Sequence, residues 1–328
     1  MPENLFRSTG GVRGVEAWVM KSKRVLVLCL YIWIISAVAE EAPRSFAYVL
    51  QAESLAESRE AVVLKLKNCG RDWIVLDALY SGEDGGAWTK AELAEIRAGK
   101  SGRKILGYLS IGEAENYRAY WKKEGMENPP DWLGPENPEW PGNYKVKYWS
   151  QAWQEILLTD LEKLMSCGFD GVYLDLVDAF EFYEYDAELD LWCDHRLNPV
   201  TGQSYRKDMV DWVGKVAGNA KKRNKDALVI PQNGSQLLKE SEYISLIHGI
   251  GVEDLFANGN RMKRREESAY VLGFLALAKQ KGLPILEIEY VQKPKVQARL
   301  VEKSIQAGTV LLQTDRELTT LGASEETP

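Results

Sequence analysis

The sequence predicts a single (β/α)8 barrel, the TIM-barrel class of α/β fold, preceded by an N-terminal export signal. Two observations favour this class. Apolar, β-branched runs alternate with helical patterns along most of the chain, and several of these runs end directly at carboxylates or amides. A third observation argues against a doubly wound open sheet, because Gln51–Ser54 after the first run is not a glycine-rich phosphate turn.

Eight short apolar runs, bounded by turn residues, predict the strands. They are Ser45–Leu50, Asp72–Ala78, Lys104–Ser110, Gly171–Leu176, Ala227–Pro231, Ile247–Val252, Pro284–Ile288 and Thr309–Leu312. Helical periodicity between them predicts helices at Leu55–Asn68, Lys90–Ala98, Gln151–Cys167, Tyr205–Arg223, Glu266–Lys281 and Pro294–Ala307.

The fourth run is the most informative, because a buried strand climbs out of a glycine turn and ends at Asp175, with Asp178 three residues later. In a barrel, the carboxyl ends of all strands converge at one face, where active sites are built. Other acids and amides follow other runs: Asp77, Glu113, Glu115, Gln232, Asn233, Glu253, Asp254, Glu287, Glu289 and Asp315. One such acid alone is an ordinary surface or capping group, but a ring of like charges costs stability unless it has a function.

Paired carboxylates without another reactive group are what glycoside hydrolysis requires. The only histidines are His195 and His248, which argues against a metal site built on several histidines. No Gly-x-Ser-x-Gly turn or phosphate-binding loop is present. We therefore expect neither a metal nor a cofactor.

The connection after the third run, residues 116–150, is rich in aromatic residues and contains five prolines. Aromatic faces at the top of a barrel could bind sugar rings, or they could pack the connection onto the barrel. Its aromatic residues are Tyr117, Tyr120, Trp121, Trp132, Trp140, Tyr144, Tyr148 and Trp149.

Two segments together resemble glycoside hydrolase family 114. Gly107–Glu115, with Tyr117, Arg118, Tyr120 and Trp121, is similar to the third-strand signature of that family, and Gly168–Asp175 is similar to its fourth strand. Trp149 and Trp153 resemble the aromatic start of the helix between them. The resemblance extends over about Ser45 to Asp315. It implies an exported barrel enzyme similar to endo-α-1,4-polygalactosaminidases.

The resemblance implies Asp175 as nucleophile or charge stabiliser and Glu253 as general acid/base. It also implies that Asp77, Glu113, Asp178 and Asn233 line the sugar subsite, and we add Tyr117, Trp121, Glu289 and Tyr290 as expected substrate contacts. A carboxylate separation of about 5 Å would indicate retention of configuration, and one of about 6.5–9.5 Å inversion.

The N-terminus predicts a secretory signal, because Lys21, Lys23 and Arg24 precede an apolar run that ends at Ala37-Val38-Ala39. We expect an extension and signal peptide over residues 1–39, with the true start at Met20, a barrel domain over 40–318 and a polar tail over 319–328. Cleavage after Ala39 would place the protein in the periplasm or outside the cell, with no stable membrane insertion.

Residues 1–39 carry five basic and two acidic side chains, so the formal charge of −7 for the whole chain becomes −10 for the rest. This acidity argues against nucleic acid as a partner and suits a cationic polysaccharide, although it could simply keep an exported protein soluble. Cys69, Cys167 and Cys193 leave one disulfide possible. Two alternatives stay open: a carbohydrate-binding barrel without catalysis, and a hydrolase of a different glycan.

Overall fold

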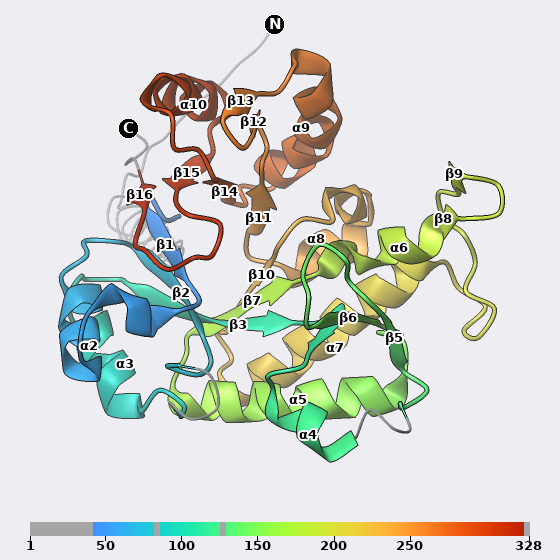
Figure 1. Cartoon of the computed structure of the whole chain (residues 1–328), viewed down its shortest axis with the longest axis horizontal. Coiled ribbons are helices and arrows are strands. Elements are labelled where there is room, and N and C mark those ends of the chain that lie inside the picture. Colours follow the sequence, from blue (N-terminus) through green and yellow to red (C-terminus); the bar gives the residue numbers. More distant parts are fainter. Residues whose placement is uncertain (1–41, 82–85, 125–128, 325–328) are drawn as a thin grey trace, which may run out of the picture. The chain divides into compact units, whose positions relative to one another are not determined.

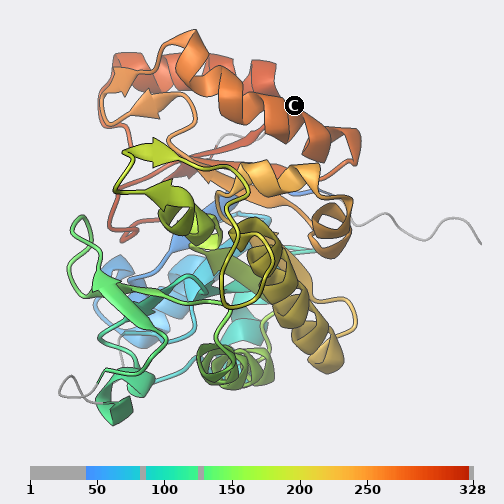
Figure 2. The ribbon, with the colours of Figure 1, turned by 90° about the vertical axis from the view of Figure 1, so that its right-hand side faces the viewer.

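The computed structural model describes residues 42–81, 86–124 and 129–324. Residues 43–328 form one compact unit, in which the main strands run between two groups of helices (Figures 1 and 2). The predicted signal peptide, its cleavage site and Met20 lie outside the described residues. Among the described helices, none is both long enough and apolar enough to cross a membrane.

Eight parallel strands form the centre of this unit, in chain order. They are β1 (Phe46–Val49), β2 (Trp73–Asp77), β3 (Lys104–Ser110), β7 (Gly171–Asp175), β10 (Leu228–Pro231), β11 (Ile250–Glu253), β14 (Ile285–Glu289) and β15 (Val310–Gln313). The first five strands form one sheet and the last three belong to a second sheet. A parallel bridge between Gln232 and Gly251 joins the two sheets at β10 and β11.

The remaining seam, between β15 and β1, is occupied by a C-terminal segment. The short strand β16 (Ala323–Ser324) pairs antiparallel with β15, and the Ser324 hydroxyl accepts a hydrogen bond from the Phe46 amide of β1 at 3.2 Å. The Leu50 amide also donates to the Leu318 carbonyl at 3.0 Å. The ordered fold therefore continues into the stretch that was expected to be a polar tail.

The major helices occupy the connections between the strands. They are α2 (Arg59–Lys67), α3 (Lys90–Arg97), α5 (Gln151–Cys167), α7 (Tyr205–Arg223), α9 (Arg265–Gln280) and α10 (Pro294–Ala307). Ser58, Thr89 and Ser204 cap the first turns of α2, α3 and α7, because each side-chain oxygen accepts a backbone N–H. The sequence did not predict the short 3₁₀ turn at Ser235–Lys239 and α8 (Ser241–Leu246) between β10 and β11.

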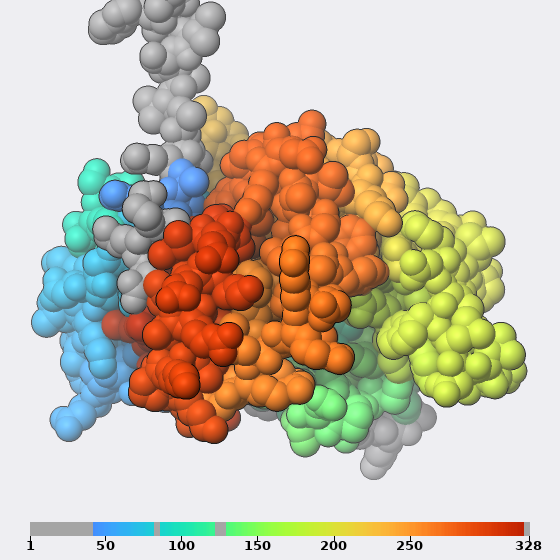
Figure 3. Space-filling model, turned by 90° about the horizontal axis from the view of Figure 1, so that it is seen from above, coloured from blue at the N-terminus to red at the C-terminus, as the bar shows by residue number. Residues whose placement is uncertain are grey.

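Two insertions extend from the carboxyl ends of β3 and β7. The first contains α4 (Ala119–Glu124) and an antiparallel sheet of β4 (Glu113–Glu115), β5 (Leu133–Glu136) and β6 (Asn143–Val146). The second contains a 3₁₀ turn at Val177–Ala179, α6 (Phe180–Glu184), and the hairpin β8 (Tyr185–Asp186) and β9 (Leu191–Trp192), which forms the protruding yellow-green lobe in Figure 3. The small hairpin β12 (Ala257–Asn258) and β13 (Arg261–Met262) follows β11.

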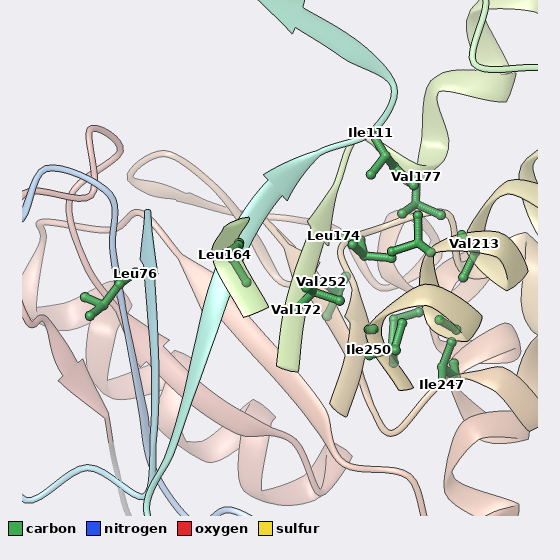
Figure 4. Packing of buried hydrophobic residues seen from close by; sticks show 14 of the residues in the cluster. Leu76, Ile111, Leu164, Val172, Leu174, Val177, Val213, Ile247, Ile250 and Val252 are labelled. Atoms are coloured by element: carbon green, nitrogen blue, oxygen red, sulfur yellow. The ribbon is translucent and has the colours of Figure 1, made fainter. Parts of the chain in front are cut away.

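Alternate strand residues pack on opposite faces, as the two-residue repeat of a strand requires. One cluster joins alternate residues from seven of the strands, among them Tyr48, Tyr108, Tyr173 and Ile288. The other residues, such as Val172, Leu174 and Val252, pack against the helices (Figure 4). A shared inner cluster is what a barrel interior provides. The predicted fold class is confirmed: the domain is a (β/α)8 barrel.

Candidate active site

The turn after β3 is fastened to the end of β7, the fourth strand of the barrel. The Ile111 amide donates to the Asp175 carbonyl at 3.1 Å, and the indoles of Trp153 and Trp212 both donate to the Ile111 carbonyl. A side chain on Gly112 would come within 2.2 Å of the Leu176 carbonyl oxygen. The Ser-Ile-Gly-Glu segment therefore fits closely against the residue that follows Asp175.

Three consecutive strand ends carry backbone strain. Leu176 after β7, Asn233 after β10 and Asp254 after β11 have φ values of 57°, 58° and 49°. Residues with a Cβ rarely adopt this left-handed region, and each such residue costs on the order of 1–3 kcal/mol. Strain of this kind clusters at functional sites, where the surrounding structure holds it in place.

The Asp175 carboxylate is held by two donors at the end of β7. The Tyr108 hydroxyl donates to Oδ2 at 2.8 Å, and the Leu176 amide donates to Oδ1 at 2.8 Å. Burial nevertheless raises the pKa of Asp175 well above its usual range, and the charge of Glu253 raises it further. Asp175 therefore retains a proton at a pH where an ordinary aspartate has lost it.

The Glu253 carboxylate, at the end of the sixth barrel strand β11, also receives two donors. The Tyr290 hydroxyl donates to Oε1, and the Asn233 side-chain amide donates to Oε2 at 3.2 Å. Asn233 in turn accepts the Glu253 backbone amide at 3.1 Å, so its side chain fixes both ends of the residue. Three of the predicted site residues, Asn233, Glu253 and Tyr290, therefore form one hydrogen-bonded group.

The two carboxylates belong to one electrostatic cluster. The charges of both Asp175 and Glu253 act on the buried hydroxyls of Tyr48 and Tyr173, and they raise the pKa of each tyrosine beyond the effect of burial. Burial raises the pKa of Asp178 to about 7, with further contributions from the charges of Glu181 and Glu253. Crowding of this kind lets a carboxylate pair divide into a proton donor and a charged partner.

A polar layer lies below the pair inside the barrel. The Tyr173 hydroxyl donates to the Gln232 side-chain oxygen, and the Tyr48 ring lies 5.0 Å from the Tyr173 ring. A side chain on Gly251 would collide with both Tyr173 and Gln232. Glycine at this position of β11 therefore leaves room for the layer that supports the two carboxylates.

Two further predicted residues are held in ion pairs near the ends of β2 and β3. Arg118 contacts both carboxylate oxygens of Asp77, at 2.8 and 2.6 Å, and also pairs with Glu115 at 2.6 Å. Glu113 is almost fully buried and pairs with Lys145. Both carboxylates are therefore held in place by cationic partners.

The eight aromatic residues of the connection divide into three that are buried, three that are partly buried and two that are exposed. Trp121, for which we expected a substrate contact, packs its ring 4.6 Å from that of Tyr144. Tyr117 is 49 % exposed, and its hydroxyl donates to Glu115 at 2.7 Å. Trp140 is the other exposed residue, at 47 %. Most of these aromatic side chains therefore pack the connection onto the barrel.

Glu289 lies on the opposite face of its strand from Tyr290. Its side chain is fully buried and accepts the backbone amides of Phe256 and Ala257, at 2.6 and 3.2 Å. Strand alternation causes this placement, because Leu286, Ile288 and Tyr290 face the barrel interior. The structure therefore gives Glu289 a role in holding the segment after β11, and we do not include it among the proposed substrate contacts.

Sequence reasoning did not assign Tyr108, Tyr48 or Tyr173 to the site, and it noted Gln232 only as an amide at a strand end. Each tyrosine lies two residues before a residue at or directly after the carboxyl end of its strand, namely Ser110, Leu50 and Asp175, and this spacing places both side chains on one face. Among the described residues, no group of three or more His, Cys, Asp and Glu side chains could hold a metal ion. Cys69, Cys167 and Cys193 are free thiols in this structure.

A barrel with two interacting carboxylates at the carboxyl ends of its fourth and sixth strands has the arrangement of a glycosidase, in which one acid protonates the leaving oxygen and the other attacks or stabilises the sugar. The model of glycoside-hydrolase family GH114 matches residues 84–327. The chain belongs to this family and is a glycoside hydrolase, as its third- and fourth-strand segments predicted.

Two relatives with 35 % identity are described as uncharacterized proteins. One, from Deinococcus radiodurans, aligns over 72 % of this chain and 71 % of its own length, and the other, MJ1477 of Methanocaldococcus jannaschii, over 83 % and 76 %. Two solved structures share the fold. The first is the glycoside hydrolase domain of PelA from Pseudomonas aeruginosa, with a TM-score of 0.63, 18 % identity and coverage of 86 % of this chain and 99 % of that one. The second is Aspergillus fumigatus Ega3 in complex with galactosamine, with a TM-score of 0.60, 18 % identity and coverage of 89 % of this chain and 98 % of that one.

Proposed function

We propose that this glycoside hydrolase cleaves an amino-sugar exopolysaccharide that contains α-1,4-linked galactosamine. The observation that carries the proposal is the concentration of acids around Asp175, where Asp178, Glu181 and Glu253 contribute to one field. This negative field stabilises the binding of a sugar that carries an ammonium group and disfavours the binding of a sugar that carries a carboxylate. The galactosamine in the Ega3 complex supports the same class of substrate.

In the proposed mechanism Glu253 is the general acid/base and Asp175 is the nucleophile or charge stabiliser. Glu253 gives its proton to the glycosidic oxygen as the bond to the anomeric carbon breaks. Asp175 faces the positive charge that develops on the sugar ring, and Tyr108 and the Leu176 amide fix its direction. An ammonium group in the site also favours the charged form of Asp175, which offsets the effect of burial on that carboxyl.

The test is release of reducing ends from purified polysaccharides. We expect turnover on partly deacetylated galactosamine polymers, and little or none on fully N-acetylated galactosamine polymers or on uncharged galactans. Asp175→Asn is the control for contaminating hydrolases. Turnover confined to an uncharged glycan would show that the catalytic assignment holds and that the substrate assignment is wrong.

We further propose that the chain is exported, with cleavage after Ala39. The basic start, the apolar run and the small residues at 37 and 39 support this proposal. Expression of the full chain followed by intact-mass measurement should give a mature protein that begins at Glu40 in the periplasm or the medium. A product that keeps residues 20–39 and sediments with membranes would indicate an uncleaved anchor instead.

A further inference from the structure

A polar hollow of about 550 Å³ lies beside the proposed catalytic pair. Segments far apart in the sequence line it: the turn between β5 and β6, the residues after β11, and the residues after β15. A volume of this size can hold one or two sugar rings, because ligand sites commonly fall in the range of about 300–1,000 Å³. Its lining includes Glu139, Trp140, Asp254, Asn258, Lys263 and Arg316.

The hollow is continuous with the catalytic pair through two contacts. Asp254 follows Glu253 directly in the chain, and its carboxylate pairs with Arg316 at 2.8 Å. The Arg316 guanidinium in turn lies over the ring of Tyr290, 4.2 Å from its centre, and the Tyr290 hydroxyl donates to Glu253. A polymer bound across Asp175 and Glu253 has this hollow as a neighbour.

The lining is rich in hydrogen-bond donors and close to neutral in charge. Lys263 donates to the Asp254 carbonyl and, among the described residues, makes no ion pair. Arg316 is matched by Asp254, so Glu139 is the acidic side chain left to balance Lys263. Around Asp175, in contrast, carboxylates outnumber the nearby cations. An ammonium group would therefore be stabilised electrostatically near Asp175 and stabilised little near Lys263 and Arg316.

Trp140 gives the hollow an apolar wall. Its indole is 47 % exposed, and it lies in a turn fixed by backbone hydrogen bonds from Trp140 to Asn137 and from Asn143 to Trp140. A rigid aromatic face beside polar groups matches a sugar ring, which has C–H groups on its face and oxygens at its edge. The donors on Lys263, Arg316 and Asn258 are suited to hydroxyl or acetamido oxygens.

We propose that this hollow is a second sugar subsite, in which Trp140 contacts the ring of a unit that carries a hydroxyl or an acetamido group rather than an ammonium group. The identity of the polymer rests on the proposed function. The enzyme then binds two kinds of unit along its substrate, a cationic unit at Asp175 and an uncharged unit at Trp140.

Calorimetric binding to the inactive Asp175→Asn protein tests this inference. The probes are two α-1,4-linked galactosamine hexamers, one fully deacetylated and one N-acetylated at alternate units. Trp140→Ala in this background should weaken binding of the partly acetylated hexamer by about tenfold, and binding of the deacetylated hexamer by less. Lys263→Gln, which removes the charge and keeps an amide donor, should reduce the difference in affinity between the partly acetylated and the deacetylated hexamer.

Trp192→Ala is the matched control, because Trp192 is also an exposed tryptophan but lies on the β8–β9 hairpin and does not line the hollow. It should leave both affinities unchanged. The inference is overturned if Trp140→Ala leaves the affinity for both hexamers equal to that of the Asp175→Asn protein, or if it lowers the affinity for the deacetylated hexamer more. It is also overturned if the Asp175→Asn protein binds neither hexamer. Binding that depends on Trp140, together with no turnover by the wild-type enzyme on any galactosamine polymer, would support the subsite and refute the proposed function.

Discussion

Two pairs of acids on the barrel strands have opposite surroundings: Asp175 and Glu253 end β7 and β11, and Glu287 and Glu289 both lie on β14. Asp175 and Glu253 face the interior side, where tyrosine hydroxyls and an amide contact them and the end of the barrel leaves them partly exposed. Glu287 and Glu289 face the helices, where hydroxyls or backbone amides bind both oxygens of each and neither side chain is exposed. A carboxylate on a barrel strand is therefore available to the proposed catalytic site or held in structural contacts according to which face of the strand it occupies.

The largest expected effect comes from Asp175→Asn. We expect kcat to fall by about 10³-fold or more, because the amide cannot act as nucleophile or carry the charge that stabilises the sugar cation. The unfolding temperature should stay close to that of the wild type or rise, since a repelled buried charge is removed. Near wild-type turnover by this variant would contradict the assignment of Asp175.

Glu287→Gln should change stability and leave catalysis intact. Burial raises the pKa of Glu287 to about 7, so the stability contributed by its bound proton is present below about pH 4.5 and is lost as the pH rises through 7. This group alone should lower the free energy of unfolding by up to about 3 kcal/mol between pH 5 and pH 8. The variant should therefore show a flatter dependence of unfolding temperature on pH than the wild type, with kcat/KM within about twofold.

A large loss of kcat/KM in folded Glu287→Gln protein would break the distinction between the two pairs. Ser304→Ala is a useful companion, because it removes one of the hydroxyls that bind Glu287 without touching the carboxylate.

Tyr290→Phe tests how much a hydrogen-bond partner of Glu253 contributes to catalysis. The change removes the hydroxyl that donates to Glu253 and keeps the ring under Arg316. We expect kcat to fall by about tenfold with KM little changed, because a hydrogen bond to a charged group is lost. A change in stability alone, with unchanged kcat, would reduce Tyr290 to a packing residue.

The smallest expected effect is that of Asp178→Asn. The charge of Asp178 raises the pKa of Asp175, so its removal should lower that pKa. Because Asp175 acts in its charged form, the acid limb of the profile of kcat/KM against pH should then move down by about half a unit. An upward shift would show that Asp178 does not act on the pair through its charge.

Much of the framework could be predicted from the sequence because the strands are short, apolar and separated by strong turns. The bounds of α5, α7 and α10 were predicted to the residue, and all eight barrel strands lie within a few residues of their predicted limits. The β4–β6–β5 sheet and α8 were missed, since their residues lack a sustained period and are placed by tertiary contacts.

The site was predictable where strand ends alone decide it, as for Asp175, Asn233 and Glu253. It was not predictable where the face of the strand matters. The two-residue repeat of a strand would place Glu289 toward the helices and Tyr108 toward the barrel interior if one residue of each strand were already assigned to a face. An apolar run that is buried on both faces, such as Ile285–Ile288, does not show which residues face the interior. The hollow beside Trp140 depends on three segments that meet only in the folded chain.

The C-terminal segment has a consequence for folding of the chain. Residues 318–324 supply the contacts between β15 and β1, and Arg71 binds the carbonyls of Gly322 and Ser324 from the other side of that seam. The edge of β1 therefore stays open until almost every other strand is present. An open edge can pair with another unfolded chain, so a chain broken before residue 318 should favour aggregation over folding.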